Sequence, residues 1–124
     1  LRARLGLLTE PVEQARAAAV HEWETMRTIL LERRLVTDDA TEEEVIAALH
    51  RYLAASPARL VGVALVDAVG ERRTQNQPGT YDEYPNWRVP LADQDGRSVT
   101  IEELGGHARF RSLVGAVDRA IRVE

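Results

Sequence analysis

The residues of this chain that are best suited to recognising a ligand lie in one segment, residues 76–91. It reads Asn-Gln-Pro-Gly-Thr-Tyr-Asp-Glu-Tyr-Pro-Asn-Trp-Arg-Val-Pro-Leu. Tyr and Trp rings cover the apolar C–H faces of a sugar ring, and Asn amides and Arg guanidinium groups bind paired hydroxyls. The segment therefore has the residue types of a sugar-binding loop, but composition alone favours a well-packed structural loop over a ligand site.

The prolines of the aromatic segment predict its local geometry. Pro78-Gly79 is typical of a tight turn, because Pro presets φ at the first corner and Gly permits a positive φ at the second. Pro85 disfavours the helical conformation for the residue before it and is expected to hold residues 86–88 extended. We expect the ring of Trp87 to be buried, so that its removal lowers stability.

Catalytic and metal-binding groups are not evident. His21, His50 and His107 lie far apart without ligand spacing to Asp or Glu, so we interpret them as structural or solvent-facing. Asp82 and Glu83 are adjacent carboxylates, but a pair that cleaves a glycosidic bond with retention must flank that bond about 5 Å apart. Neighbouring residues of an extended loop point in different directions, so we reject this pair and expect no catalytic residue, metal or cofactor in the chain.

Three amphipathic helices are expected, near residues 9–35, 41–55 and 107–122, two before the aromatic segment and one after it. Thr9 is a candidate cap of the first, and Trp23 and Met26 are expected in its core-facing stripe. Thr41-Glu42-Glu43-Glu44 and Thr100-Ile101-Glu102-Glu103 read as capping boxes. Residues 67–70 predict one helical turn closed by Gly70, and Asp95-Gly96 predicts a tight turn.

The apolar run at residues 60–66 favours a strand buried on both faces, and a helix is the alternative. An isolated strand leaves unpaired N–H and C=O groups. We therefore expect residues 60–65, outside a complete sheet, to be helical, buried under other helices, or paired with a second copy of the chain.

Composition narrows the class of protein. A chain of 124 residues supports at most one domain, and it begins at Leu1 without an initiator Met, so we expect a fragment. A net charge of −4 argues against a nucleic-acid surface. No apolar run is long enough for a membrane span, and the absence of cysteine suits a cytoplasmic protein.

The aromatic segment resembles the C-terminal signature of the bacterial 4-α-glucanotransferases (amylomaltases, or disproportionating enzymes), Asn-x-Pro-Gly-Thr-x-x-Glu-Tyr-Pro-Asn-Trp-Arg. The matching positions are Asn76, Pro78, Gly79, Thr80, Glu83, Tyr84, Pro85, Asn86, Trp87 and Arg88. Residues 57–61 and 65–70 also resemble the segments that precede this signature. Tyr81 departs from it, because a smaller residue is expected after Thr80.

The resemblance implies a mainly α (α+β) chain that forms the C-terminal portion of a (β/α)8 barrel enzyme. It implies a helical insertion at residues 1–56, the last strand and active-site loop at 57–100, and the final helix at 101–124. The implied substrate is an α-1,4-glucan or maltooligosaccharide, and the catalytic carboxylates are implied to lie outside this chain. The implied substrate-binding residues are Asn76, Pro78, Gly79, Asn86, Trp87 and Arg88. The alternative function is a helical protein-interaction module with the aromatic segment as a peptide-binding edge.

Overall fold

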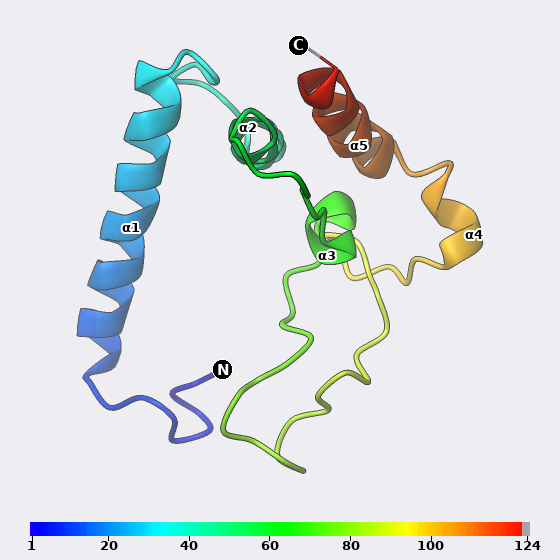
Figure 1. Cartoon of the computed structure of the whole chain (residues 1–124). Helices are drawn as coiled ribbons and strands as arrows, with labels where there is room; N and C mark the ends of the chain where they lie inside the picture. Colours follow the sequence, from blue (N-terminus) through cyan, green and yellow to red (C-terminus); the bar gives the residue numbers. More distant parts are fainter. Residues whose placement is uncertain (123–124) are drawn as a thin grey trace. The chain divides into compact units, whose positions relative to one another are not determined.

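The chain folds mainly into helices. A computed structural model describes residues 1–122, and within them the elements are α1 (Val12–Glu32), α2 (Glu42–Ala54), α3 (Leu65–Val69), α4 (Ile101–Leu104) and α5 (Ala108–Ile121) (Figure 1). The predicted helices at 41–55 and 107–122 are confirmed within one residue at each end, and the mainly helical class is confirmed.

The first helix is shorter than predicted at both ends. Pro11 restricts the residue before it, so α1 begins at Val12 and Thr9 lies outside the helix. At the other end Arg34 takes a left-handed φ of 55°. The Arg34 N–H then bonds to Leu31 O at 2.9 Å and the Leu35 N–H to Leu30 O at 2.9 Å. This is the Schellman pattern, which ends a helix and turns the chain back towards its last turn.

Capping boxes start α2 and α4, as predicted. The Thr41 N–H donates to Glu44 Oε2 at 2.8 Å, and the Glu44 N–H donates to Thr41 Oγ1 at 3.3 Å. Before α4, the Thr100 N–H donates to Glu103 Oε2 at 2.9 Å. These side chains satisfy backbone groups that have no partner in the first turn of a helix.

The strand predicted at residues 60–66 is wrong. Residues 60–64 are irregular, α3 begins at Leu65, and the one β-bridge among the described residues joins Ala92 to Ser98. A strand needs a neighbouring strand for its backbone hydrogen bonds, and the described part of the chain offers none here. Val61 and Val63 are half-buried, whereas Leu60 is 92% exposed. The helical turn closed by Gly70 is confirmed, with φ 85°.

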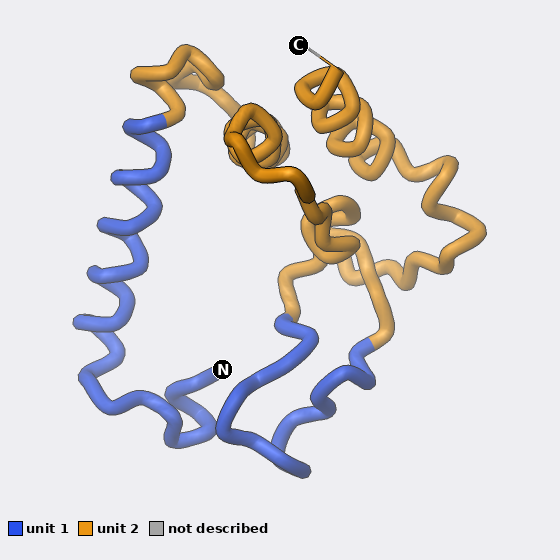
Figure 2. The backbone as a smooth tube through the Cα atoms, in the orientation of Figure 1, with its two compact units in different colours: residues 1–29, 74–89 blue, residues 30–73, 90–124 orange. Residues whose placement is uncertain are grey.

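The chain divides into two compact units (Figure 2). Unit 1 comprises Leu1–Ile29 and Thr74–Val89. Unit 2 comprises Leu30–Arg73 and the residues from Pro90 onward. We call the segment Thr74–Val89 the braced loop, since hydrogen bonds described below cross it repeatedly.

The core of unit 2 forms where α5 packs on α2 and on α3. One cluster surrounds the last turn of α1 and the inner face of α2, and the other joins α3, α4 and the start of α5. The buried members are Leu30, Val45 and Ala48 in the first cluster and Val69, Val99 and Leu104 in the second. Leu113, Ala116 and Val117 are buried on α5.

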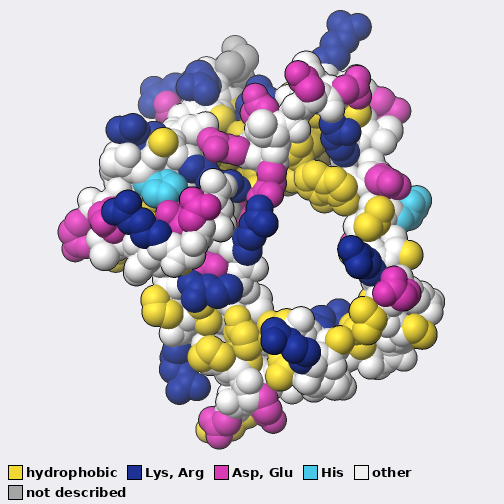
Figure 3. Space-filling model, turned by 180° about the vertical axis from the view of Figure 1, so that it is seen from behind, with side chains coloured by type: hydrophobic (Ala, Val, Ile, Leu, Met, Phe, Trp, Pro, Cys, Tyr) yellow, Lys and Arg dark blue, Asp and Glu magenta, His cyan; other side chains and the backbone are white. Residues whose placement is uncertain are grey.

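The prediction that Trp23 and Met26 are core residues is wrong. Their exposed fractions are 39% and 38%, and Leu30 is the buried residue of α1. Within unit 1, as the structure describes it, α1 is the only helix, so no second helix of that unit covers the stripe. Amphipathic spacing shows which face of a helix can be buried, but burial requires a second element against that face. Exposed hydrophobic side chains lie between charged ones on the face drawn in Figure 3.

Candidate functional site

The side chain of Asn86 holds the two halves of the braced loop together. Its Oδ1 accepts the Gln77 N–H at 2.7 Å, and its Nδ2 donates to Thr80 Oγ1 at 2.9 Å. The Thr80 hydroxyl donates in turn to Gln77 O at 2.7 Å. Gln77 is buried, so these bonds satisfy backbone groups that water does not reach. The amide of Asn86 therefore faces into the loop and braces it.

The turn at Pro78-Gly79 is confirmed. The Thr80 N–H bonds to Gln77 O at 3.2 Å, and Gly79 has a φ of 87°. A positive φ at the third residue fits a type II turn with Pro at its second position. The N-terminal segment lies against this turn. A Cβ placed on Gly79 would lie 3.1 Å from Leu7 Cδ2. Arg2, Leu7, Gln77 and Pro78 line a hollow of about 350 Å³ there.

Two further bonds tie the end of the braced loop to its beginning. The Tyr84 hydroxyl donates to Thr74 O at 2.6 Å, and the Trp87 N–H donates to Gln75 O at 2.7 Å. Trp87 adopts a φ of 58°, which is rare for a bulky residue. Such strain persists when surrounding contacts over-determine the backbone, and it gathers at functional sites.

The ring of Trp87 projects into solvent, so its predicted burial is wrong. It is 76% exposed. The hydrogen bond to Gln75 O uses the backbone N–H of Trp87 and leaves its ring unbound. Pro78 and Arg88 are also exposed, and Asn76 is half-buried. The side chain of Asn76 makes no hydrogen bond among the described residues, so its amide is available to a ligand.

A buried carboxylate closes the stem of the braced loop within unit 2. The Glu71 side chain is 3% exposed and accepts Arg73 Nη2 at 2.6 Å and Nε at 2.9 Å. It also accepts the Ala92 N–H at 2.9 Å, while Arg73 Nη2 donates to Pro90 O at 2.7 Å. These bonds join the residues before the loop to those after it. The hydrogen bonds from Arg73 outweigh burial and lower the pKa of Glu71 to about 2.

Glu83 acts as a local brace in this structure. Its carboxylate accepts the Tyr81 N–H at 2.7 Å, and this bond lowers the pKa of Glu83. A general acid at a glycosidic bond needs a raised pKa instead. This electrostatic environment supports the interpretation that Asp82 and Glu83 are not a catalytic pair.

The histidines occupy structural or exposed positions. His50 is buried, with Nδ1 2.9 Å from Ile46 O and Nε2 3.8 Å from Asp67 Oδ2. His107 Nδ1 accepts the Phe110 N–H at the start of α5, and His21 is exposed on α1. Among residues 1–122, His, Asp and Glu side chains form no cluster that could hold a metal ion. No helix in this part of the chain is long and apolar enough to cross a membrane.

Sequence reasoning missed the residues that hold the braced loop from outside. Leu7 is far from Gly79 along the chain, and Glu71 reaches Ala92 across the whole loop. The signal for the second contact was an acidic and a basic residue, Glu71 and Arg73, immediately before an aromatic segment. The pairing itself could not be read from the sequence, because it depends on the return path of the chain.

The braced loop thus presents exposed rings, a half-buried amide without a hydrogen-bond partner among the described residues, and an exposed guanidinium. The sequence profile described as 4-alpha-glucanotransferase matches residues 10–95. The chain belongs to this family.

Relatives extend the match over nearly the whole chain. A 4-alpha-glucanotransferase of Mycobacterium bovis is 48% identical over 122 residues, which cover 97% of this chain and 17% of the relative. A 4-alpha-glucanotransferase of Mycobacterium tuberculosis strain H37Rv gives the same values. The crystal structure of amylomaltase from Corynebacterium glutamicum matches with a TM-score of 0.81 and 33% identity, over 94% of this chain and 18% of that chain. The chain thus spans about a sixth of the length of these relatives. The interaction-module alternative gains no support from them.

Proposed function

We propose that this chain is part of a 4-alpha-glucanotransferase that moves α-1,4-glucan segments between maltooligosaccharides with retention of configuration. The observation that carries the proposal is the 48% identity over 97% of this chain to a 4-alpha-glucanotransferase. The family signature falls on the braced loop, where an amide, a guanidinium and a ring are accessible.

In such a transfer a carboxylate attacks the anomeric carbon while a carboxylic acid protonates the departing sugar oxygen. The 4-hydroxyl of an acceptor sugar then displaces the enzyme carboxylate, and its proton returns to the acid/base group. In this proposal both carboxylates come from a (β/α)8 barrel outside the present residues. The chain contributes residues 1–56 as a helical insertion, 57–100 as the loop region and 101–124 as the region that contains the final helix, α5. No cofactor takes part.

The residues of the braced loop have distinct proposed roles at the substrate. Asn76 contacts the sugar near the cleaved bond, and the exposed ring of Trp87 covers an apolar sugar face. Arg88 binds hydroxyls in pairs, as its planar guanidinium allows. Pro78 and Gly79 shape the turn that precedes this surface, and Asn86 holds the loop in register.

Replacing Asn76 in the longer enzyme tests this assignment. Asn76→Ala should lower kcat/KM for maltotriose by the equivalent of about 2–4 kcal/mol, because a hydrogen bond aimed at the transition state is lost. The unfolding temperature should change little, since the Asn76 amide has no partner among the described residues. Gln14→Ala, which removes an exposed amide from α1, is the matched control. Unchanged transfer by Asn76→Ala would refute the assignment.

The chain by itself should not redistribute maltotriose, because retaining transfer needs two carboxylates across one bond. Chromatography of the products would reveal any maltooligosaccharide of a different length. Activity that returns when the remaining part of the enzyme is added would support the proposal. Disproportionation by these 124 residues alone would overturn the placement of the carboxylates.

We also infer a cytoplasmic location from the absence of cysteine, and no binding to nucleic acid from the net charge of −4.

Self-association of the isolated chain stays a prediction. Leu60 is 92% exposed and would favour it. Light scattering of the wild type and of Leu60→Asp would measure it.

A further inference from the structure

Three consecutive backbone carbonyls, ending with that of Asn76, each accept a hydrogen bond within unit 1. The first, that of Thr74, accepts the Tyr84 hydroxyl at 2.6 Å. The next, that of Gln75, accepts the Trp87 N–H at 2.7 Å. The third, that of Asn76 itself, accepts the Thr74 hydroxyl at 2.6 Å. The backbone that carries the Asn76 side chain is therefore held by donors from both halves of the braced loop.

The side chain of Asn76 is not bonded in the same way as its backbone. Its amide is half-buried and makes no hydrogen bond among the described residues. The amide of Asn86, by contrast, is bonded to the Gln77 N–H and to the Thr80 hydroxyl. A fixed backbone sets the direction of the Cα–Cβ bond, so only the staggered rotamers remain open to the Asn76 amide. An unused polar group on a fixed backbone binds a ligand at a low ordering cost.

Tyr84 is itself well placed to hold Thr74. Pro85 disfavours the helical conformation at Tyr84, and the Asn86 N–H donates to Tyr84 O at 2.8 Å. The half-buried ring of Tyr84 then reaches a carbonyl ten positions earlier in the chain. A Tyr side chain has two torsions, so it makes such a contact at a small entropic cost.

We propose that Tyr84, acting through Thr74, is a positioning residue that orients the Asn76 amide for the transfer reaction. This inference rests on the proposed function of Asn76. Tyr84 holds the carbonyl of Thr74, and the Thr74 hydroxyl holds the carbonyl of Asn76. Neither of the two touches the sugar. Such positioning matters because a displacement of about 1 Å at a reacting centre costs on the order of a hundredfold in rate.

Steady-state kinetics of the longer enzyme with maltotriose test the proposal, at a temperature well below the unfolding transition of every variant. Tyr84→Phe removes only the hydroxyl and should lower kcat roughly three- to tenfold, the equivalent of one hydrogen bond. KM should change by less than about twofold, because Asn76 is proposed to act in the transition state. Thr74→Val should lower kcat similarly, and Thr74→Ser, which keeps the hydroxyl, should restore it. Equal losses in Thr74→Val and Thr74→Ser would overturn the proposal.

A double-mutant cycle with Asn76→Ala separates positioning from loop stability. Because Tyr84 acts through Asn76 in this proposal, Tyr84→Phe should alter kcat by less than about twofold in the Asn76→Ala background. A loss of loop stability alone would lower kcat by the same factor in both backgrounds. That additive result would overturn the proposal.

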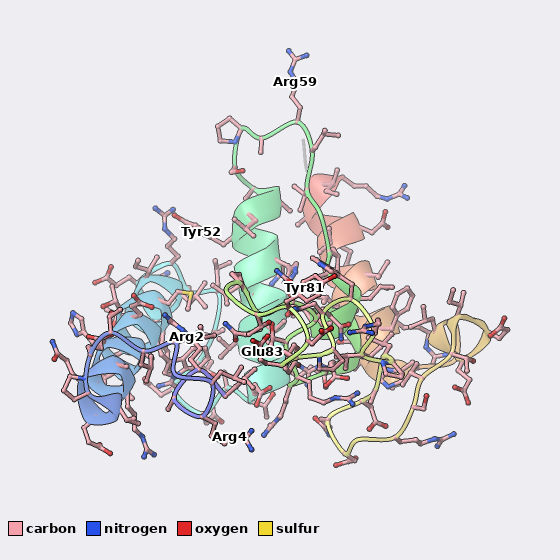
Figure 4. All side chains as sticks on the ribbon, turned by 90° about the horizontal axis from the view of Figure 1, so that it is seen from below. Arg2, Arg4, Tyr52, Arg59, Tyr81 and Glu83 are labelled. Atoms are coloured by element: carbon pink, nitrogen blue, oxygen red, sulfur yellow. The ribbon has the colours of Figure 1, made fainter. Side chains whose placement is uncertain are left out.

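Tyr52→Phe is the matched control, because it removes the same hydroxyl from α2 in unit 2 (Tyr52 is labelled in Figure 4). The Tyr52 hydroxyl makes no hydrogen bond among the described residues, so kcat should be unchanged. An unchanged kcat in Tyr84→Phe would overturn the role of Tyr84, and a lowered kcat in Asn76→Ala would then leave the proposed function standing. An unchanged kcat in Asn76→Ala would overturn both.

Discussion

Leu7 packs directly against Gly79, so closely that a Cβ atom on Gly79 would lie 3.1 Å from Leu7 Cδ2. The N-terminal segment therefore touches the turn that leads into the exposed part of the braced loop. Two features favour Gly at this position: its φ of 87° and the closeness of Leu7, whose side chain would have to shift to admit a Cβ. The two features can be separated by experiment.

Gly79→Ala should lower the free energy of unfolding by more than the roughly 1–2 kcal/mol that a left-handed conformation costs an L-residue. Gly96→Ala is the control, because Gly96 has a similar φ of 81° but no heavy atom within 4 Å of the added Cβ. Chemical denaturation of both variants measures the difference. Equal losses would show that Leu7 moves aside without cost.

Trp87 should be more important for activity than for stability. Its ring is 76% exposed, so Trp87→Ala loses little buried apolar area. Trp87→Gly removes the same ring and also relieves the strain at a φ of 58°. We expect Trp87→Gly to be more stable than Trp87→Ala by about 1 kcal/mol. In the longer enzyme, both substitutions should reduce transfer to maltotriose. Thermal unfolding and product analysis give the two readouts. A large stability loss in Trp87→Ala would restore the buried-ring interpretation.

Asn86→Ala should destabilise the braced loop by about 1–3 kcal/mol, because the buried Gln77 N–H would lose its acceptor. Asn86→Asp retains an acceptor for that N–H but loses the donor to Thr80, so a smaller loss is expected. Hydrogen exchange of the Gln77 amide should accelerate in the same order. Unchanged exchange in Asn86→Ala would show that another group satisfies this N–H.

The Glu71 carboxylate should make the stability of the chain depend on pH in the acidic range. Its pKa is about 2, below the usual value of 4.5, because Arg73 donates to its side chain. Because the pKa of Glu71 is lowered on folding, its carboxylate stabilises the folded chain fully above pH 4.5. This stabilisation is lost as the pH falls towards about 2. Glu71→Gln should therefore be less stable than the wild type by on the order of 2 kcal/mol near neutral pH. That difference should shrink below pH 4.5.

Asp118→Asn is the control for Glu71, because Asp118 pairs with Arg122 on an exposed helix face. Such a pair contributes roughly 0.3–0.5 kcal/mol. Urea denaturation at several pH values measures both variants. A pH-independent difference between the wild type and Glu71→Gln would contradict an ionised Glu71 as the source of the stabilisation.

The sequence by itself determined the local features of this protein. Helix periodicity and capping boxes gave α2 and α5 within one residue, because these signals act between residues a few positions apart. The turns at Gly79 and Gly96 followed from the conformational freedom of Gly. The contiguous signature from Asn76 to Arg88 was sufficient to place the chain in its family.

Tertiary structure decided which of these features are buried, paired or exposed. Residues 60–64 have the composition of a strand but no strand beside them, so they remain irregular. Trp23 has the spacing of a core residue, but unit 1, as described, holds no second helix to cover it. The ring of Trp87 is exposed, although it lies in a segment held by hydrogen bonds. The contacts between Leu7 and Gly79 and between Glu71 and Ala92 join residues that are distant in sequence. Local preference restricts each residue to a few conformations, and only the approach of distant segments selects among them.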